Sequence, residues 1–105
     1  MDDKIAIIVW RCLLGEIYPA IRAIAVKYAD ETLTITYYLD RHPTPSDEES
    51  ASVLATNIFA ASGNLLFKEV VFDCQFSDLS FKDMDHMDGF VYCRREYDID
   101  DVLPQ

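Results

Sequence analysis

The sequence has few basic residues and no apolar run long enough to cross a membrane. Only 9 of its 105 residues are Lys or Arg, against 19 Asp or Glu, so the net charge is −10. Nucleic acids and anionic membranes bind proteins largely through Lys and Arg, and we therefore expect neither as a direct partner. The apolar stretch 5–14 is interrupted by Arg11 and is far shorter than the ~20 residues that span a bilayer. No basic segment with a small-residue cleavage site marks a secretory signal at the N-terminus, so we expect a cytoplasmic protein.

Cysteines and catalytic motifs are equally sparse. Cys12, Cys74 and Cys93 are odd in number, widely spaced and without a CxxC pair, which favours reduced thiols over disulfides. The P-loop, GxSxG and HExxH motifs are absent. The acids around His86 do not follow the spacing of a calcium-binding loop. We therefore expect no enzyme, no cofactor and no metal, and keep a small metal protein or enzyme as a minor alternative.

What the sequence does have is half apolar residues and 12% aromatics, which predicts one folded domain over residues 1–105. Residues 5–14 show a helical stripe, with Asp2 and Asp3 at its start and Gly15 at its end, although the β-branched run 7–9 would also suit a strand. Ser46 and Glu49 have the spacing of a capping box, and they predict a helix that ends at Gly63.

Four strands complete the pattern. Residues 19–28 and 32–39 alternate in hydrophobicity and predict a hairpin, and residues 65–76 and 90–97 predict two further strands. In 32–39, one face is apolar and the other, rich in Thr, suits solvent. The order α-β-β-α-β-β predicts an α+β domain, a four-stranded mainly antiparallel sheet with both helices packed on one face.

The acids concentrate towards the C-terminus. From residue 73 onward there are nine acids and three bases, so this third of the chain carries −6 of the −10. Such a concentration of acids favours a surface for a basic partner. The alternative interpretation is a solvated acidic face that binds no partner. The candidate partner-binding residues are Asp83, Asp85, Asp88, Glu96, Asp98, Asp100 and Asp101. Apolar residues between 76 and 87 would either anchor the partner or pack under the sheet.

Four segments carry a resemblance to a known family: LLGEIYPAIRA at 13–23, YYLD at 37–40, EESASVLAT at 48–56 and VYCRRE at 91–96. Together they resemble small bacterial immunity proteins of contact-dependent growth inhibition and related polymorphic toxin systems. The resemblance implies a protein that binds and neutralises a cognate toxin domain, commonly a basic nuclease, in the cytoplasm of the producing cell. Another acidic binding module, either a nucleic-acid mimic or a regulatory subunit, is the alternative.

Overall fold

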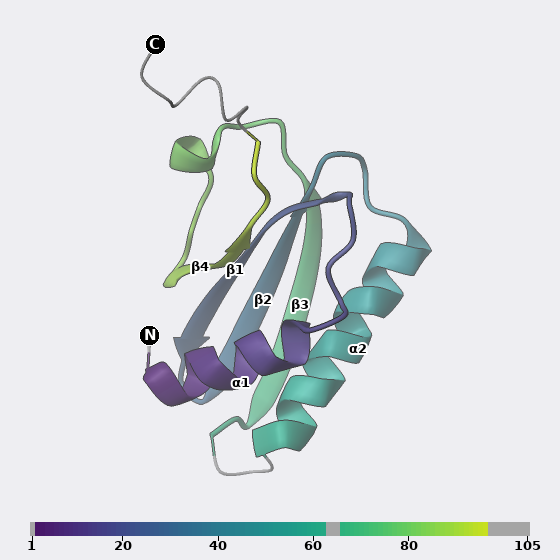
Figure 1. The fold of residues 1–105 in the computed structure, drawn as a ribbon. Coiled ribbons are helices and arrows are strands. Elements are labelled where there is room, and N and C mark those ends of the chain that lie inside the picture. Colours follow the sequence, from purple (N-terminus) through teal and green to yellow (C-terminus); the bar gives the residue numbers. More distant parts are fainter. Residues whose placement is uncertain (1, 63–65, 97–105) are drawn as a thin grey trace.

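The computed structural model describes residues 2–62 and 66–96. Its elements are α1 (Asp3–Leu13), β1 (Ile21–Ala29), β2 (Thr32–Leu39), α2 (Pro45–Ser62), β3 (Glu69–Phe76), the 3-10 turn η1 (Phe81–Asp83) and β4 (Gly89–Cys93). Both helices cover the same face of the sheet (Figure 1). The predicted α+β class and the order of helices and strands are confirmed, and η1 is an addition within the connection between β3 and β4.

The sheet has the strand order β3-β2-β1-β4 and is mixed. The hairpin β1–β2 and the pairing of β1 with β4 are antiparallel, whereas β2 and β3 are parallel. The predicted antiparallel pairing is therefore confirmed for β1 with β2 and with β4, but not for β2 with β3. Because α2 carries the chain back along the sheet between β2 and β3, the two strands run in the same direction.

Helix α1 forms where the helical stripe predicts it. Asp2 is the N-cap, and its carboxylate accepts a hydrogen bond of 2.7 Å from the backbone N–H of Lys4. The helix ends at Leu13, with Leu14 as C-cap. Gly15 follows with φ +82°, the left-handed conformation that glycine adopts most readily after a helix.

The predicted capping box of α2 is wrong by two residues. The helix begins at Pro45, so Thr44 and not Ser46 precedes it. The backbone N–H of Thr44 donates to Asp47 Oδ2 at 2.7 Å, and the N–H of Asp47 lies 3.4 Å from Thr44 Oγ1. Proline suits the first helical position because its fixed φ is helical and its missing N–H would have no partner there. The helix therefore starts at Pro45, and the reciprocal cap is formed by Thr44 and Asp47.

The main core lies between the helices and the sheet. The predicted apolar face of β2 is confirmed, since all four of its residues are fully buried: Leu33, Ile35, Tyr37 and Leu39. The opposite face is not left to solvent as expected. The connection 77–88 crosses it, and Tyr38 and Met84 there bury against Ala23 and Ala25 of β1. The small alanine side chains leave room for the connection to lie close to the sheet.

Candidate functional site

The connection between β3 and β4 forms an acidic pocket where it crosses the sheet. The pocket has a volume of about 510 Å³ and is lined by Tyr38, Gln75, Phe76, Ser77, Asp78, Leu79, Asp83, Met84 and Asp85. Its three carboxylates belong to exposed residues. Tyr38 and Met84 are buried, whereas Phe76 and Leu79 are 42% and 49% exposed. The site therefore combines exposed negative charge with accessible apolar surface.

Arg22 of β1 fixes one wall of this pocket from beneath. It is only 9% exposed, and its Nη1 donates to the carbonyl oxygens of Ser77 and Leu79 at 2.8 and 2.7 Å. Its Nε and Nη2 donate to the two carboxylate oxygens of Glu96 at 2.8 and 2.6 Å. The guanidinium also lies 5.3 Å from the ring centre of Phe81. One buried cation thus joins the acidic connection to the segment after β4.

Short-range hydrogen bonds hold the loop acids in place. Ser80 Oγ donates to Asp83 Oδ2 at 2.9 Å, and the backbone N–H of Met87 donates to Asp85 Oδ1 at 2.8 Å. The hydroxyl of Tyr38 donates to the Asp85 carbonyl oxygen at 2.7 Å. The acidic rim is therefore pre-formed by its own turns and by the sheet below it.

Comparison with known families bears on what such a site is for. The family model described as MafI2 immunity protein matches residues 2–96. This chain belongs to the MafI2 immunity protein family. A comparison with curated proteins found no match. Membership confirms the resemblance to small bacterial immunity proteins of polymorphic toxin systems, and it implies a toxin as the partner and an inhibitor as the role.

In this MafI2-family protein, the predicted acids divide into four groups, the last of which is Glu96 alone. Asp83 and Asp85 lie at the pocket, as does Asp78, an acid of the same cluster that was not among the candidates. Asp88 is exposed beyond it, and its carboxylate accepts from the backbone N–H of Tyr28 at 2.7 Å. Asp98, Asp100 and Asp101 lie outside the described residues.

Glu96 differs from the loop acids because two arginines neutralise it. Besides the bidentate contact with Arg22, it accepts from Arg94 at 2.8 Å, and Arg94 also pairs with Asp40 at 2.7 Å. The Arg22 contact is the main cause that holds the pKa of the Glu96 carboxyl below its usual range. Glu96 therefore contributes more to joining segments than to free negative charge.

The apolar residues in and around the connection between β3 and β4 divide between the two predicted roles: some pack under the sheet and others stay exposed for a partner. Met84 is buried, and Phe81, Met87 and Phe90 pack around it against the sheet, so these form a second small core. Phe76 and Leu79 remain exposed at the pocket. The division could not be read from the sequence because the connection has no regular hydrophobic period.

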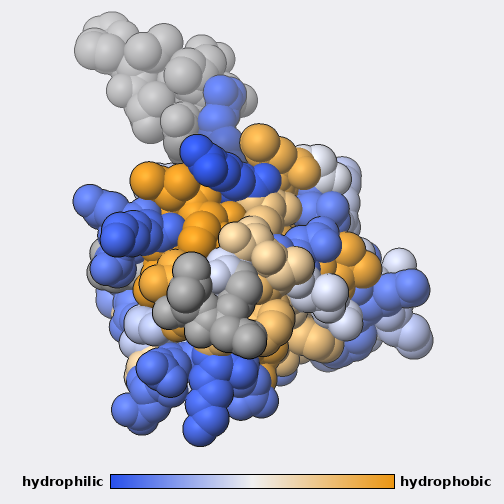
Figure 2. All heavy atoms as spheres, turned by 90° about the horizontal axis from the view of Figure 1, so that it is seen from below, coloured by the Kyte–Doolittle hydropathy of each residue, from blue (hydrophilic) through white to orange (hydrophobic). Residues whose placement is uncertain are grey.

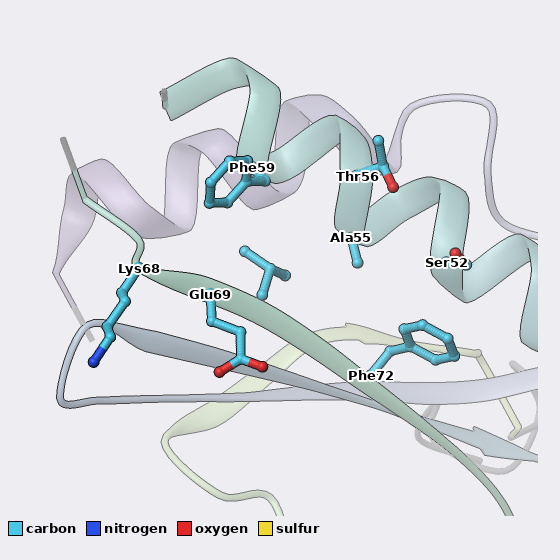
Figure 3. A pocket seen from close by; sticks show the side chains of 8 residues that line it. Ser52, Ala55, Thr56, Phe59, Lys68, Glu69 and Phe72 are labelled. Atoms are coloured by element: carbon cyan, nitrogen blue, oxygen red, sulfur yellow. The ribbon is translucent and has the colours of Figure 1, made fainter. Parts of the chain in front are cut away.

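A second pocket, of about 360 Å³, lies between α2 and the edge strand β3 (Figure 3). Its polar lining residues are Ser52, Thr56, Lys68 and Glu69, and its apolar lining includes Phe59 from α2 and Phe72 from β3. Lys68 and Glu69 supply one charge of each sign, so the groove has no net charge to attract a charged partner.

The remaining chemistry in the described residues is modest. Within residues 2–62 and 66–96, no group of three His, Cys, Asp or Glu side chains could hold a metal ion. Neither helix in that part of the chain combines the length and the apolar character that crossing a membrane requires. Burial, and secondarily Glu96, raises the pKa of the Cys93 thiol, which disfavours the thiolate that a nucleophile needs.

Proposed function

We propose that this protein neutralises a toxin domain with nuclease activity and a basic cleft, in the cytoplasm of the producing cell, through the acidic pocket. The observation that carries the proposal is the grouping of Asp78, Asp83 and Asp85 around exposed Phe76 and Leu79. A nuclease cleft is built to receive phosphates, and carboxylates of the same charge sign can take their place.

The two kinds of residue would act on different steps of binding. Carboxylates attract a basic partner over a distance and raise the association rate. For strongly steered pairs the increase is about 10- to 1000-fold, and the association rate constant reaches ~10⁸ M⁻¹s⁻¹ and above. Exposed Phe76 and Leu79 would bury on contact and slow dissociation, because a few central apolar residues carry most of the energy of an interface. Fast capture suits an inhibitor whose target is lethal.

Pre-formation of the surface also favours this function. The carbonyls of Ser77 and Leu79 are held by buried Arg22, and the acids at 83 and 85 accept hydrogen bonds within the loop. A surface that is already ordered loses less conformational entropy when a partner binds. Through Glu96, the same arginine holds the chain just before the three candidate acids at 98, 100 and 101.

The test is the kinetics of binding to the cognate toxin domain. The double change Asp83→Asn and Asp85→Asn removes two charges but keeps the oxygen that accepts from Ser80 and from Met87. We expect association at low salt to slow by about tenfold and its salt dependence to flatten, with little change in dissociation. Glu49→Gln with Glu69→Gln, both at exposed positions outside the pocket, is the control of equal charge.

Two further variants complete the test. Leu79→Ala keeps the carbonyl that Arg22 binds and should speed dissociation while leaving association unchanged. Neutralising Asp98, Asp100 and Asp101 together tests the rest of the predicted surface, with loss of protection in co-expression with the toxin as a second readout. Equal association rates at low salt for the wild type, the pocket variant and the control would show that the toxin binds elsewhere.

A further inference from the structure

Helix α1 carries an apolar stripe on the side that faces away from the core. Ile7 and Trp10 are three residues apart and share one face of the helix, and Leu14, the C-cap, follows directly after the last turn. They are 44%, 51% and 81% exposed, and Ile17, just beyond the helix, is 38% exposed. The core-facing side of the same helix is separate and buried, through Ile5, Ala6, Val9 and Leu13.

An exposed stripe of this kind marks an interaction surface. A half-exposed tryptophan between aliphatic residues is the composition of interface hot spots, and contiguous exposed apolar surface is uncommon on proteins that stay monomeric. Figure 2 views the molecule from the end where α1 lies in Figure 1, and it shows hydrophobic residues gathered in the middle with hydrophilic ones around them.

The charges beside the stripe are balanced in sign and form no ion pair with any other described residue. Residues 2–14 contain Asp2, Asp3, Lys4 and Arg11, two of each sign, in a chain whose net charge is −10. In the described part of the chain, none of these four side chains takes part in an ion pair. Two copies of this acidic protein would repel one another across most surfaces, and α1 is a place where they can approach without that repulsion.

We propose that two copies of the chain associate through α1, with the two helices antiparallel about a two-fold axis near Ile7. At a rise of about 1.5 Å per residue, this arrangement sets residues equally distant from Ile7 side by side. Asp3 of one copy then lies opposite Arg11 of the other, and Lys4 opposite Trp10, a cation facing an aromatic ring. Both contacts occur twice by symmetry, because an isologous interface is self-complementary.

The acidic pocket stays free in such a dimer. In Figure 1, α1 runs along the lower part of the molecule, whereas η1, whose Asp83 lines the pocket, lies near the top. Self-association and toxin binding therefore use different surfaces, and each can be tested in variants that leave the other intact.

Trp10 is the only tryptophan of the chain, so its fluorescence reports directly on this interface. We expect its emission to shift to shorter wavelength, and quenching by acrylamide to fall, as protein concentration rises, in step with a doubling of mass in sedimentation equilibrium. Asp3→Arg or Arg11→Asp alone should weaken the dimer by about tenfold, and the two together should restore it. Val53→Ala, at a 44% exposed position on α2, is the control and should leave the dimer unchanged.

Three results would overturn the proposal. The first is a monomer at all concentrations up to about 1 mM, where even weak complexes form. The second is a dimer that persists in Trp10→Ala, with circular dichroism confirming that the variant is folded. The third is a double charge exchange that fails to restore association. If the wild type is monomeric and Trp10→Ala weakens toxin binding, the stripe belongs to the toxin interface instead.

Discussion

At the scale of single residues, buried Asp47 does more to join segments than any acid of the predicted site. Its side chain is 1% exposed and accepts hydrogen bonds from the Tyr18 hydroxyl at 2.7 Å, from both terminal nitrogens of Arg41, and from Thr44. These residues come from the segment before β1, the loop after β2 and the cap of α2. Asp47 is therefore a structural carboxylate and is not available to a partner.

Replacing Asp47 by Asn should lower the free energy of unfolding at pH 7 by about 2 kcal/mol, as expected when hydrogen bonds to a charged group are lost. Ser46→Ala is the matched control. Ser46 is exposed, and its side chain makes no hydrogen bond to any described residue, so its replacement should leave the urea midpoint unchanged. A loss for Ser46→Ala as large as that for Asp47→Asn would contradict the assignment of the cap.

The wild type and Asp47→Asn should also differ in how their stability depends on pH. The Arg41 guanidinium, followed by Tyr18 and Thr44, holds the pKa of the Asp47 carboxyl well below its usual range. Because the folded-state pKa lies below the unfolded value of about 3.9, the stabilisation is complete above that value and is lost as the pH falls towards the folded-state pKa. The difference in unfolding free energy between the wild type and Asp47→Asn should therefore shrink from pH 5 to pH 2. A difference independent of pH would show that the charge of Asp47 is not what stabilises the fold.

At the scale of elements, the turn of the β1–β2 hairpin is formed by residues that suit it poorly. Asp30 and Glu31 have φ of 53° and 64° between paired Ala29 and Thr32. Positive φ at both central residues is the geometry of the common two-residue hairpin, for which Asn-Gly is preferred. Asp tolerates this conformation through its short polar side chain, whereas the longer Glu gains no such compensation.

Glu31→Gly should therefore raise the free energy of unfolding, by about 1 kcal/mol, the typical cost of a left-handed residue with a Cβ. The carbonyl of residue 31 accepts from the Lys68 N–H at 2.7 Å, and this backbone contact is retained in the variant. Asp30→Gly is the control and should gain less. The urea midpoints of the three proteins measure the effect, and a lower midpoint for Glu31→Gly would mean that the side chain stabilises the turn.

Local patterns predicted most elements, and contacts between distant residues account for what was missed. The alternation of β2 identified its buried face, but it is the same for parallel and antiparallel neighbours and could not reveal the pairing with β3. The clustering of acids was visible, but the pocket depends on Arg22, whose contacts span 55 to 74 positions. The sequence does not single out the exposed stripe of α1, because Ile7 and Trp10 stand in a run that is also rich in core residues.

At the scale of the whole molecule, excess negative charge acts on stability and on binding in opposite ways. The described residues contain four ion pairs, which involve Arg22, Arg41 and Arg94. A net charge of −10 on a chain of this length destabilises the compact state through self-repulsion. Under the proposed function, the same charge would attract a basic toxin, so the fold would give up some stability for fast association.

Salt should therefore stabilise the protein while it slows capture of the toxin. Raising NaCl from about 10 mM to about 0.15 M shortens the screening length from roughly 30 to 8 Å, which weakens repulsion between distant carboxylates more than it weakens close ion pairs. We expect Tm to rise by about 5 °C, corresponding to roughly 1 kcal/mol for a domain of this size. Neutralising Asp98, Asp100 and Asp101 by Asn lowers the net charge to −7 and should reduce this increment. A Tm that falls with NaCl would mean that the ion pairs outweigh self-repulsion, and the excess of acids would then need no compensating role in binding.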